Sequence, residues 1–132
     1  MEVTLLLCDA ADESNGKLYV LGGGWNTMVP DQPINMALAL LIAVPWDQAN
    51  RKFTVLATLM TADGQQVRME DQDVAATGQL EVGRPVGMKP GSPLNVPFAL
   101  RFNGIALPEG GYRWEVQIDG TLMATAPFRA TT

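Results

Sequence analysis

The sequence is dominated by segments in which apolar and polar residues alternate one by one. Every second residue is large and apolar in Leu94–Phe102 and in Tyr112–Ile118, and Phe53–Leu59 and Thr121–Arg129 repeat the pattern. Successive side chains of a strand point to opposite faces, so this alternation predicts strands with one face in a core and one in water. No window has the apolar spacing of an amphipathic helix.

Tight-turn dipeptides separate the apolar runs. They are Asn15-Gly16, Asp63-Gly64, Asn103-Gly104 and Asp119-Gly120. Such dipeptides supply the positive φ that two-residue hairpins require. The expected strands lie near residues 2–9, 17–23, 34–44, 52–62, 65–70, 74–82, 94–102, 111–118 and 121–129. One helical turn is expected at Trp46–Arg51, with Asp47 as its N-cap.

This pattern predicts an all-β, two-layer antiparallel β-sandwich of immunoglobulin-like type, with seven to nine strands. The chain has 132 residues, of which 47% are hydrophobic, and residues 1–132 are expected to form one domain with one core. Trp114 should lie in that core, because it is in phase with Val116 and Ile118. The expected core residues are Leu5, Leu7, Leu18, Val20, Leu40, Ile42, Phe53, Val55, Leu59, Phe98, Leu100, Trp114, Val116, Ile118 and Phe128.

Met36–Val44 departs from the alternation because it is apolar on both faces. One face carries Met36, Leu38, Leu40, Ile42 and Val44, and the other carries Ala37, Ala39, Leu41 and Ala43. Two interpretations are open. The second face packs on another chain, most simply in a symmetric dimer, or the strand is central and its alanines face an overlying segment. The Gly83–Pro93 loop, rich in Gly and Pro, is a second candidate for an interface.

The charges are distributed unevenly along the chain. Nine basic and fourteen acidic residues give a net charge of −5, and residues 1–50 contain a single base, Lys17. The remaining bases are scattered among acids rather than clustered on one segment, so neither nucleic acid nor an anionic membrane is expected as a partner. The longest apolar stretch is too short for a membrane span, the N-terminus lacks a basic signal region, and Cys8 stands alone. A cytoplasmic location is expected.

The residues that most enzymes need are missing. Histidine is absent and Cys8 is the one thiol, which excludes Ser-His-Asp and Cys-His catalysis and a conventional zinc site. Gly22–Gly24 is followed by Trp25 rather than by Lys and Ser or Thr, so it is expected to end a strand and not to bind phosphate. The acidic groups lack the spacing of a calcium loop. The expected protein is not an enzyme and has no metal or cofactor.

Two functions from different classes remain. The favoured one is a non-catalytic interaction module that forms a homo-oligomer, with a dimer favoured, or binds another protein. The alternative is a small-ligand or carbohydrate-binding sandwich that uses Trp25, Trp46 and the Gly83–Pro93 loop. A carboxylate-only enzyme is the least favoured. The candidate interaction surface consists of Trp25, Leu41, Trp46, Arg84 and Met88.

Several blocks of the sequence resemble a known family. Residues 15–25 (NGKLYVLGGGW) are similar to the opening of a set of small uncharacterised bacterial proteins, a domain of unknown function. Residues 44–50 (VPWDQAN), 83–87 (GRPVG) and 107–114 (LPEGGYRW) resemble its later blocks. The resemblance implies a bacterial β-sandwich and brings no assigned activity or catalytic residue.

The charge distribution leads to a direct test with DNA. Without a basic face, the protein should bind duplex DNA no tighter than about 10⁻⁴ M at physiological salt, the weak limit of non-specific binding. Fluorescence anisotropy of a labelled duplex measures this. Micromolar binding that weakens as salt is added would show that the scattered bases form a basic face in the folded protein.

Overall fold

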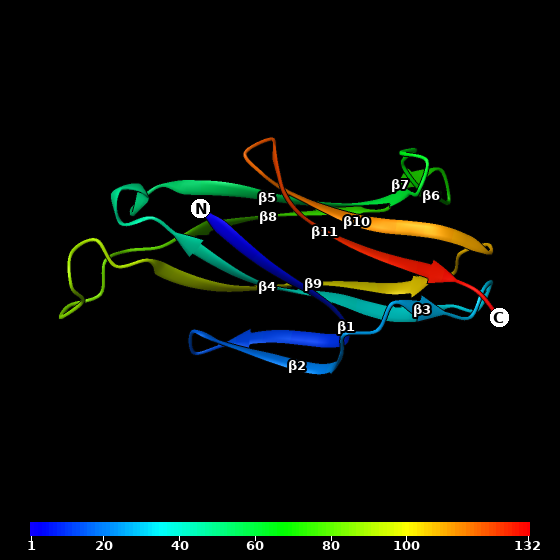
Figure 1. The fold of residues 1–132 in the computed structure, drawn as a ribbon, viewed down its shortest axis with the longest axis horizontal. Helices are drawn as coiled ribbons and strands as arrows, with labels where there is room; N and C mark the ends of the chain where they lie inside the picture. Colours follow the sequence, from blue (N-terminus) through cyan, green and yellow to red (C-terminus); the bar gives the residue numbers. More distant parts are fainter.

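The computed structural model describes all residues from Met1 to Thr132, and its regular secondary structure consists of strands and a single 3₁₀ turn (Figure 1). The strands are β1 (Glu2–Ser14), β2 (Lys17–Gly23), β3 (Thr27–Met28), β4 (Ile34–Val44), β5 (Lys52–Thr61), β6 (Arg68–Met69), β7 (Gln72–Asp73), β8 (Ala75–Glu81), β9 (Leu94–Ile105), β10 (Gly110–Ile118) and β11 (Thr121–Ala130). One sheet has the order β2-β1-β4-β9, the other has the order β3-β11-β10-β5-β8, and β6 and β7 form a separate ribbon. The all-β sandwich predicted from the alternation is confirmed.

The strand count of seven to nine is too low. Eleven strands are present, because β3, β6 and β7 are two-residue pairings too short to show an alternating pattern. One of them also breaks the antiparallel rule, since β3 runs parallel to β11. The strand expected at 65–70 is reduced to Arg68–Met69, which turns through Glu70 and Asp71, both with positive φ, into β7.

The core lies between the two sheets and contains 24 buried residues. Trp114 is fully buried, with its ring centroid 4.2 Å from that of Phe102, as its phase predicts. Four of the expected core residues lie elsewhere: Leu5 and Phe98 are half-buried at the margin of this core, and Leu18 and Val20 pack on the outer side of the first sheet. Alternation identifies the inward face of a strand, but it does not reveal which layer that face meets.

β4 is a central strand, paired with β1 on one side and β9 on the other. Its outer face is covered by the chain itself. β1 pairs with β4 through residues 2–8 and with β2 through residues 8–14. β1 bends between these two halves, and the bend folds the β1–β2 hairpin back over the outer face of β4 (Figure 1). Ala37 and Ala39 are buried there against Ala11, Leu18 and Val20.

The two interpretations of Met36–Val44 are thereby separated. Ala37 and Ala39 have exposures of 0% and 2%, so this part of the second face is already covered within one chain. Ala37 and Ala39 are therefore not available for an interface between chains, as the second interpretation expects. Leu41 lies beyond the hairpin and is 38% exposed, opposite Thr4 and Pro97 on the neighbouring strands.

The turn dipeptides differ in conformation, and Asp63-Gly64 forms a turn with positive φ at Gly64 alone. Asn15-Gly16 and Asp119-Gly120 have positive φ at both residues and close the two-residue hairpins that the sequence predicts. Asn103-Gly104 does not form a turn. It lies inside β9, where Gly104 has a φ of 69° and the pairing with β4 shifts its register, so it forms a bulge.

The helical turn is shorter than expected and is capped differently. It is a 3₁₀ turn over Trp46–Gln48, and its N-cap position is occupied by Pro45 rather than Asp47. Pro45 fixes an extended conformation before the turn and provides no side-chain acceptor. Asp47 instead lies in the first turn, where its negative charge interacts favourably with the N–H groups that have no partner within the turn.

Tyr112 fixes the connection between β9 and β10, which crosses from one sheet to the other. Its hydroxyl donates a 2.7 Å hydrogen bond to the Pro108 carbonyl, and its ring stacks on Phe128 with centroids 5.7 Å apart. Burial, with a smaller contribution from Asp31, raises the pKa of Tyr112. A tyrosine that bonds back to the backbone just upstream is a feature of immunoglobulin-like sandwiches, where it is called a tyrosine corner.

The covered alanine face leads to a pair of opposed mutational effects. Ala39→Leu should destabilise the protein by roughly 1–3 kcal/mol, because the added carbons force the hairpin away from the sheet. Leu41→Glu should cost about 1 kcal/mol or less, since Leu41 is already partly in water. Urea denaturation measures both variants against wild type, and the opposite order of stabilities would contradict the layered arrangement.

Candidate functional site

The five residues of the predicted interaction surface do not form one surface. Trp25 lies between β2 and β3, at the end of the sandwich where Tyr112 pairs with Phe128. Trp46 and Arg84 meet at the opposite end, where β4 leads into β5. Leu41 occupies the outer face of β4 between these ends. Sequence position alone did not show this separation.

Trp25 serves mainly to close one end of the core. Its ring meets Phe128 edge-on, with centroids 6.1 Å apart and an interplanar angle of 79°. The preceding glycines make this position reachable, because Gly22 and Gly24 both have positive φ and Gly23 ends β2. This agrees with the expectation that Gly22–Gly24 ends a strand. The Trp25 indole Nε1 is buried without an acceptor among the protein atoms.

Trp46 and Arg84 form a clamp at the base of the Gly83–Pro93 loop. The Arg84 guanidinium lies over the Trp46 ring, with Cζ 4.8 Å from the centroid. Its Nε and Nη2 also donate to the Trp46 carbonyl oxygen at 3.1 and 2.8 Å. The same side chain thus satisfies a carbonyl and covers an aromatic face. The sequence named both residues but gave no sign that they touch.

Beyond this clamp, the loop consists of two successive turns. The Met88 N–H donates to the Pro85 carbonyl at 3.3 Å, and the Ser92 N–H donates to the Lys89 carbonyl at 3.1 Å. Gly87 and Gly91 have φ near +90° at the third position of each turn, which is typical of type II turns. Val86 stands at the corner of the first turn and is fully exposed, and Met88 is 38% exposed.

The charges of this loop are all of one sign. Arg84 and Lys89 are its two charged residues, and no acid occurs between residues 83 and 93. We call the exposed part, Val86, Met88 and Lys89, the loop tip. It presents two apolar side chains and one cation on a backbone that the turns and the clamp hold in place.

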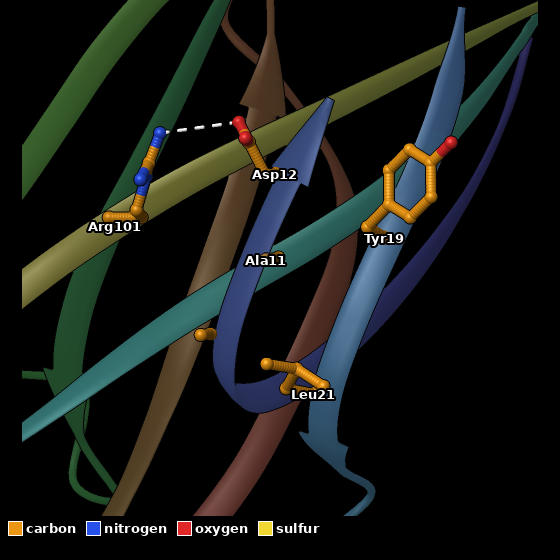
Figure 2. A pocket seen from close by; sticks show the side chains of 6 residues that line it. Ala11, Asp12, Tyr19, Leu21 and Arg101 are labelled. Atoms are coloured by element: carbon orange, nitrogen blue, oxygen red, sulfur yellow. Dashed lines mark hydrogen bonds and ion pairs between the residues drawn. The ribbon is translucent and has the colours of Figure 1, made fainter. Parts of the chain in front are cut away.

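A second feature lies on the outer face of the β1–β2 hairpin. A shallow groove of about 150 Å³ is lined by Ala10, Ala11, Asp12, Tyr19, Leu21 and Arg101 (Figure 2). Tyr19 and Leu21 project from β2 with exposures of 54% and 71%. Arg101 reaches across from β9 to Asp12, with 3.3 Å between Nη2 and Oδ1. Leu21 was not predicted as a surface residue of interest, although the sequence places it in phase with Tyr19 on the strand at 17–23.

The chemistry available in the structure is limited. No polar or charged side chain is buried, and no three residues of the types His, Cys, Asp and Glu lie close enough to hold a metal ion. Cys8 is fully buried and its Sγ donates to the Ala37 carbonyl at 3.4 Å. Burial, and to a lesser degree the charge of Asp9, raises the pKa of the Cys8 thiol. A buried thiol with a raised pKa is a poor nucleophile.

Comparison with known proteins identifies the family. Residues 3–131 match the model of DUF6941, a family of unknown function. The chain belongs to this family. The match covers almost the whole chain and agrees with the resemblance to an uncharacterised domain family found in the sequence.

Other comparisons add little to this membership. A search of curated proteins finds no match. Among solved structures, the alkylpurine DNA glycosylase AlkC of Pseudomonas fluorescens, bound to DNA containing an abasic site analog, is similar over 99% of this chain and 31% of its own, with 13% identity and a TM-score of 0.43. The structure has no helix with the length and hydropathy of a membrane span.

The position of Cys8 leads to a test of the hairpin layer. At pH 8 the native thiol should react with Ellman's reagent at least about 100-fold more slowly than in denaturant, the factor expected if access requires an opening of about 3 kcal/mol. Folding raises the pKa of Cys8 above its ordinary value of 9.0, so its contribution to stability is complete below that pH and declines as the pH rises above it.

The matched variant is Cys8→Ala, which lacks this titration and should lose less stability between pH 8 and pH 10 than wild type does. Urea denaturation at both pH values gives the comparison. Equal labelling rates for native and unfolded protein would show that the hairpin does not cover the thiol.

Proposed function

We propose that this DUF6941 protein is a non-catalytic cytosolic interaction module that presents its loop tip, Val86, Met88 and Lys89, to a protein partner. The observation that carries the proposal is the clamp of Arg84 on Trp46, which holds a fully exposed valine on a pair of tight turns. The lone cysteine supports the cytosolic location.

The contacts at the base of the loop lower the cost of ordering it when a partner binds. A flexible loop loses conformational entropy when a partner fixes it, and this loss subtracts from affinity. Here the Arg84 side chain, the two turns and the Asn50 N–H bond to the Val82 carbonyl at 2.8 Å fix the loop before any partner binds. Because the loop is fixed in advance, less of the free energy gained by burying Val86 and Met88 is lost to ordering the loop.

The loop tip also indicates the chemistry of its partner. Val86 and Met88 require an apolar pocket that removes them from water. The flanking cations favour carboxylates at the rim of that pocket, which would speed association and exclude basic surfaces. We therefore propose as partner a protein surface with an apolar depression and an acidic rim.

The alternative function, a carbohydrate or small-ligand binder, needs both tryptophans on one surface. Trp25 and Trp46 lie at opposite ends of the sandwich, and Arg84 covers one face of the Trp46 ring. This placement supports the interaction module over the ligand binder. The absence of buried charged side chains supports a function without catalysis.

The experiment compares immobilised wild type with Val86→Asp and Val29→Asp in capture from cells of the source organism. Val29 is an exposed valine at the other end of the molecule and provides the matched control. The expected partner is retained by wild type and by Val29→Asp and lost by Val86→Asp. Once purified, the partner should bind Val86→Asp at least about 30-fold more weakly, because the variant loses the roughly 2 kcal/mol gained by burying a valine side chain.

Two further measurements complete the test. Lys89→Glu should slow association and reduce its dependence on salt, if the rim of the pocket is acidic. Thermal melting should be the same for wild type and Val86→Asp, because Val86 makes no contact that folding needs. Capture of the same proteins by wild type and Val86→Asp would refute the role of the loop tip.

A further inference from the structure

The free edges of the two sheets are protected to different degrees. An exposed edge strand offers unpaired N–H and C=O groups to other chains, and proline is one of the devices that prevents this. β9, at one edge of the first sheet, contains Pro97 opposite Leu41. β11, which β3 covers only at its end, contains Pro127.

β2 has no such protection. It forms the other edge of the first sheet, contains no proline, and has Lys17 as its one charged residue. Its two outward side chains, Tyr19 and Leu21, are large and mostly in water. β8 is also an edge strand, but its exposed side chains are small or polar, with Thr77, Gln79 and Glu81 among them. β2 is therefore the edge best suited to pairing.

We propose that β2 pairs antiparallel with β2 of a second copy of this chain, about a two-fold axis at Val20. The proposal does not depend on the loop tip. Pairing about Val20 places the extended residues Tyr19–Leu21 of the two copies opposite one another, and Gly22, with a φ of 61°, marks the end of the regular pairing. Tyr19 then lies opposite the partner's Leu21, and the reciprocal pair forms on the other side of the axis. Such aromatic–aliphatic pairs across strands stabilise a sheet.

The charges indicate that the occupant is a second copy. In this register Lys17 faces the partner's Gly23. The Asp9 side chain of each chain lies against Gly22, in the space that a Cβ atom there would fill, and so approaches the β2 edge. Lys17 of one copy thus meets the partner's Asp9, and symmetry makes the contact twice. Lys17 is the one base among residues 1–50, and this arrangement gives it an acidic partner.

The remaining acids do not oppose this pairing. Asp12 and Glu13 belong to β1, which lies one strand away from the edge. In the dimer the two β1 strands are separated by three strand spacings, about 14 Å. This exceeds the Debye length of about 8 Å at physiological salt, so their repulsion is largely screened. The two hairpins together form a four-stranded outer layer with Tyr19 and Leu21 of both chains on one face.

Sedimentation equilibrium tests the proposal directly. Wild type should approach twice the monomer mass of 14.2 kDa as its concentration is raised toward about 1 mM. Leu21→Lys should remain at the monomer mass, and Leu122→Lys, which alters an exposed leucine away from β2, should dimerise like wild type. Circular dichroism should show that both variants are folded. A monomeric wild type, or a dimeric Leu21→Lys, would overturn the proposal.

A charge exchange tests the register and the identity of the occupant. Lys17→Glu and Asp9→Lys should each weaken dimerisation by about 3- to 10-fold, because each places like charges together at two symmetric contacts. The double variant restores opposite charges and should recover the wild-type dissociation constant. If the double variant is as weak as the single variants, Lys17 and Asp9 do not meet and the proposed register is wrong.

Discussion

The structure depends on the close contact between the alanine face of β4 and the β1–β2 hairpin. Ala37 and Ala39 are small enough for the hairpin to lie directly on the sheet, and Leu18 and Val20 fill the space from the other side. Larger side chains would hold the hairpin away, and the backbone bend in β1 would lose its packing. Because of this contact, an eleven-residue strand that is apolar on both faces lies inside a single chain.

The same contact determines what the molecule exposes. Once the hairpin covers the alanines, its own outer face becomes the surface, and Tyr19 and Leu21 stand in water. The hairpin that covers one apolar face thus exposes another, on an edge strand rather than on a sheet face. The loop tip lies apart from this layer, at the end of the sandwich where Arg84 holds Trp46. The two proposed surfaces can therefore be occupied independently.

Much of the fold could be predicted from local patterns. Apolar runs and the turns between them located the eight long strands, although β1 extends to Ser14 rather than residue 9, and alternation placed Trp114 in the core because the side-chain period of a strand is two. Asn15-Gly16 and Asp119-Gly120 were recognisable as hairpin turns because few other residue pairs accept positive φ at both positions. Asn103-Gly104 has the same chemistry but forms a bulge, since positive φ suits a bulge as well as a turn.

The sequence by itself determined the fold class, the inward face of the clearly alternating strands and the lack of conventional catalytic groups, because these follow from residue type and local spacing. Only the tertiary structure decided which layer each face meets. It placed Leu18 and Val20 outside the main core, brought Arg84 onto Trp46 across 38 residues of sequence, and separated Trp25 from Trp46. These outcomes depend on contacts between distant segments, and no local pattern of hydrophobicity encodes such contacts.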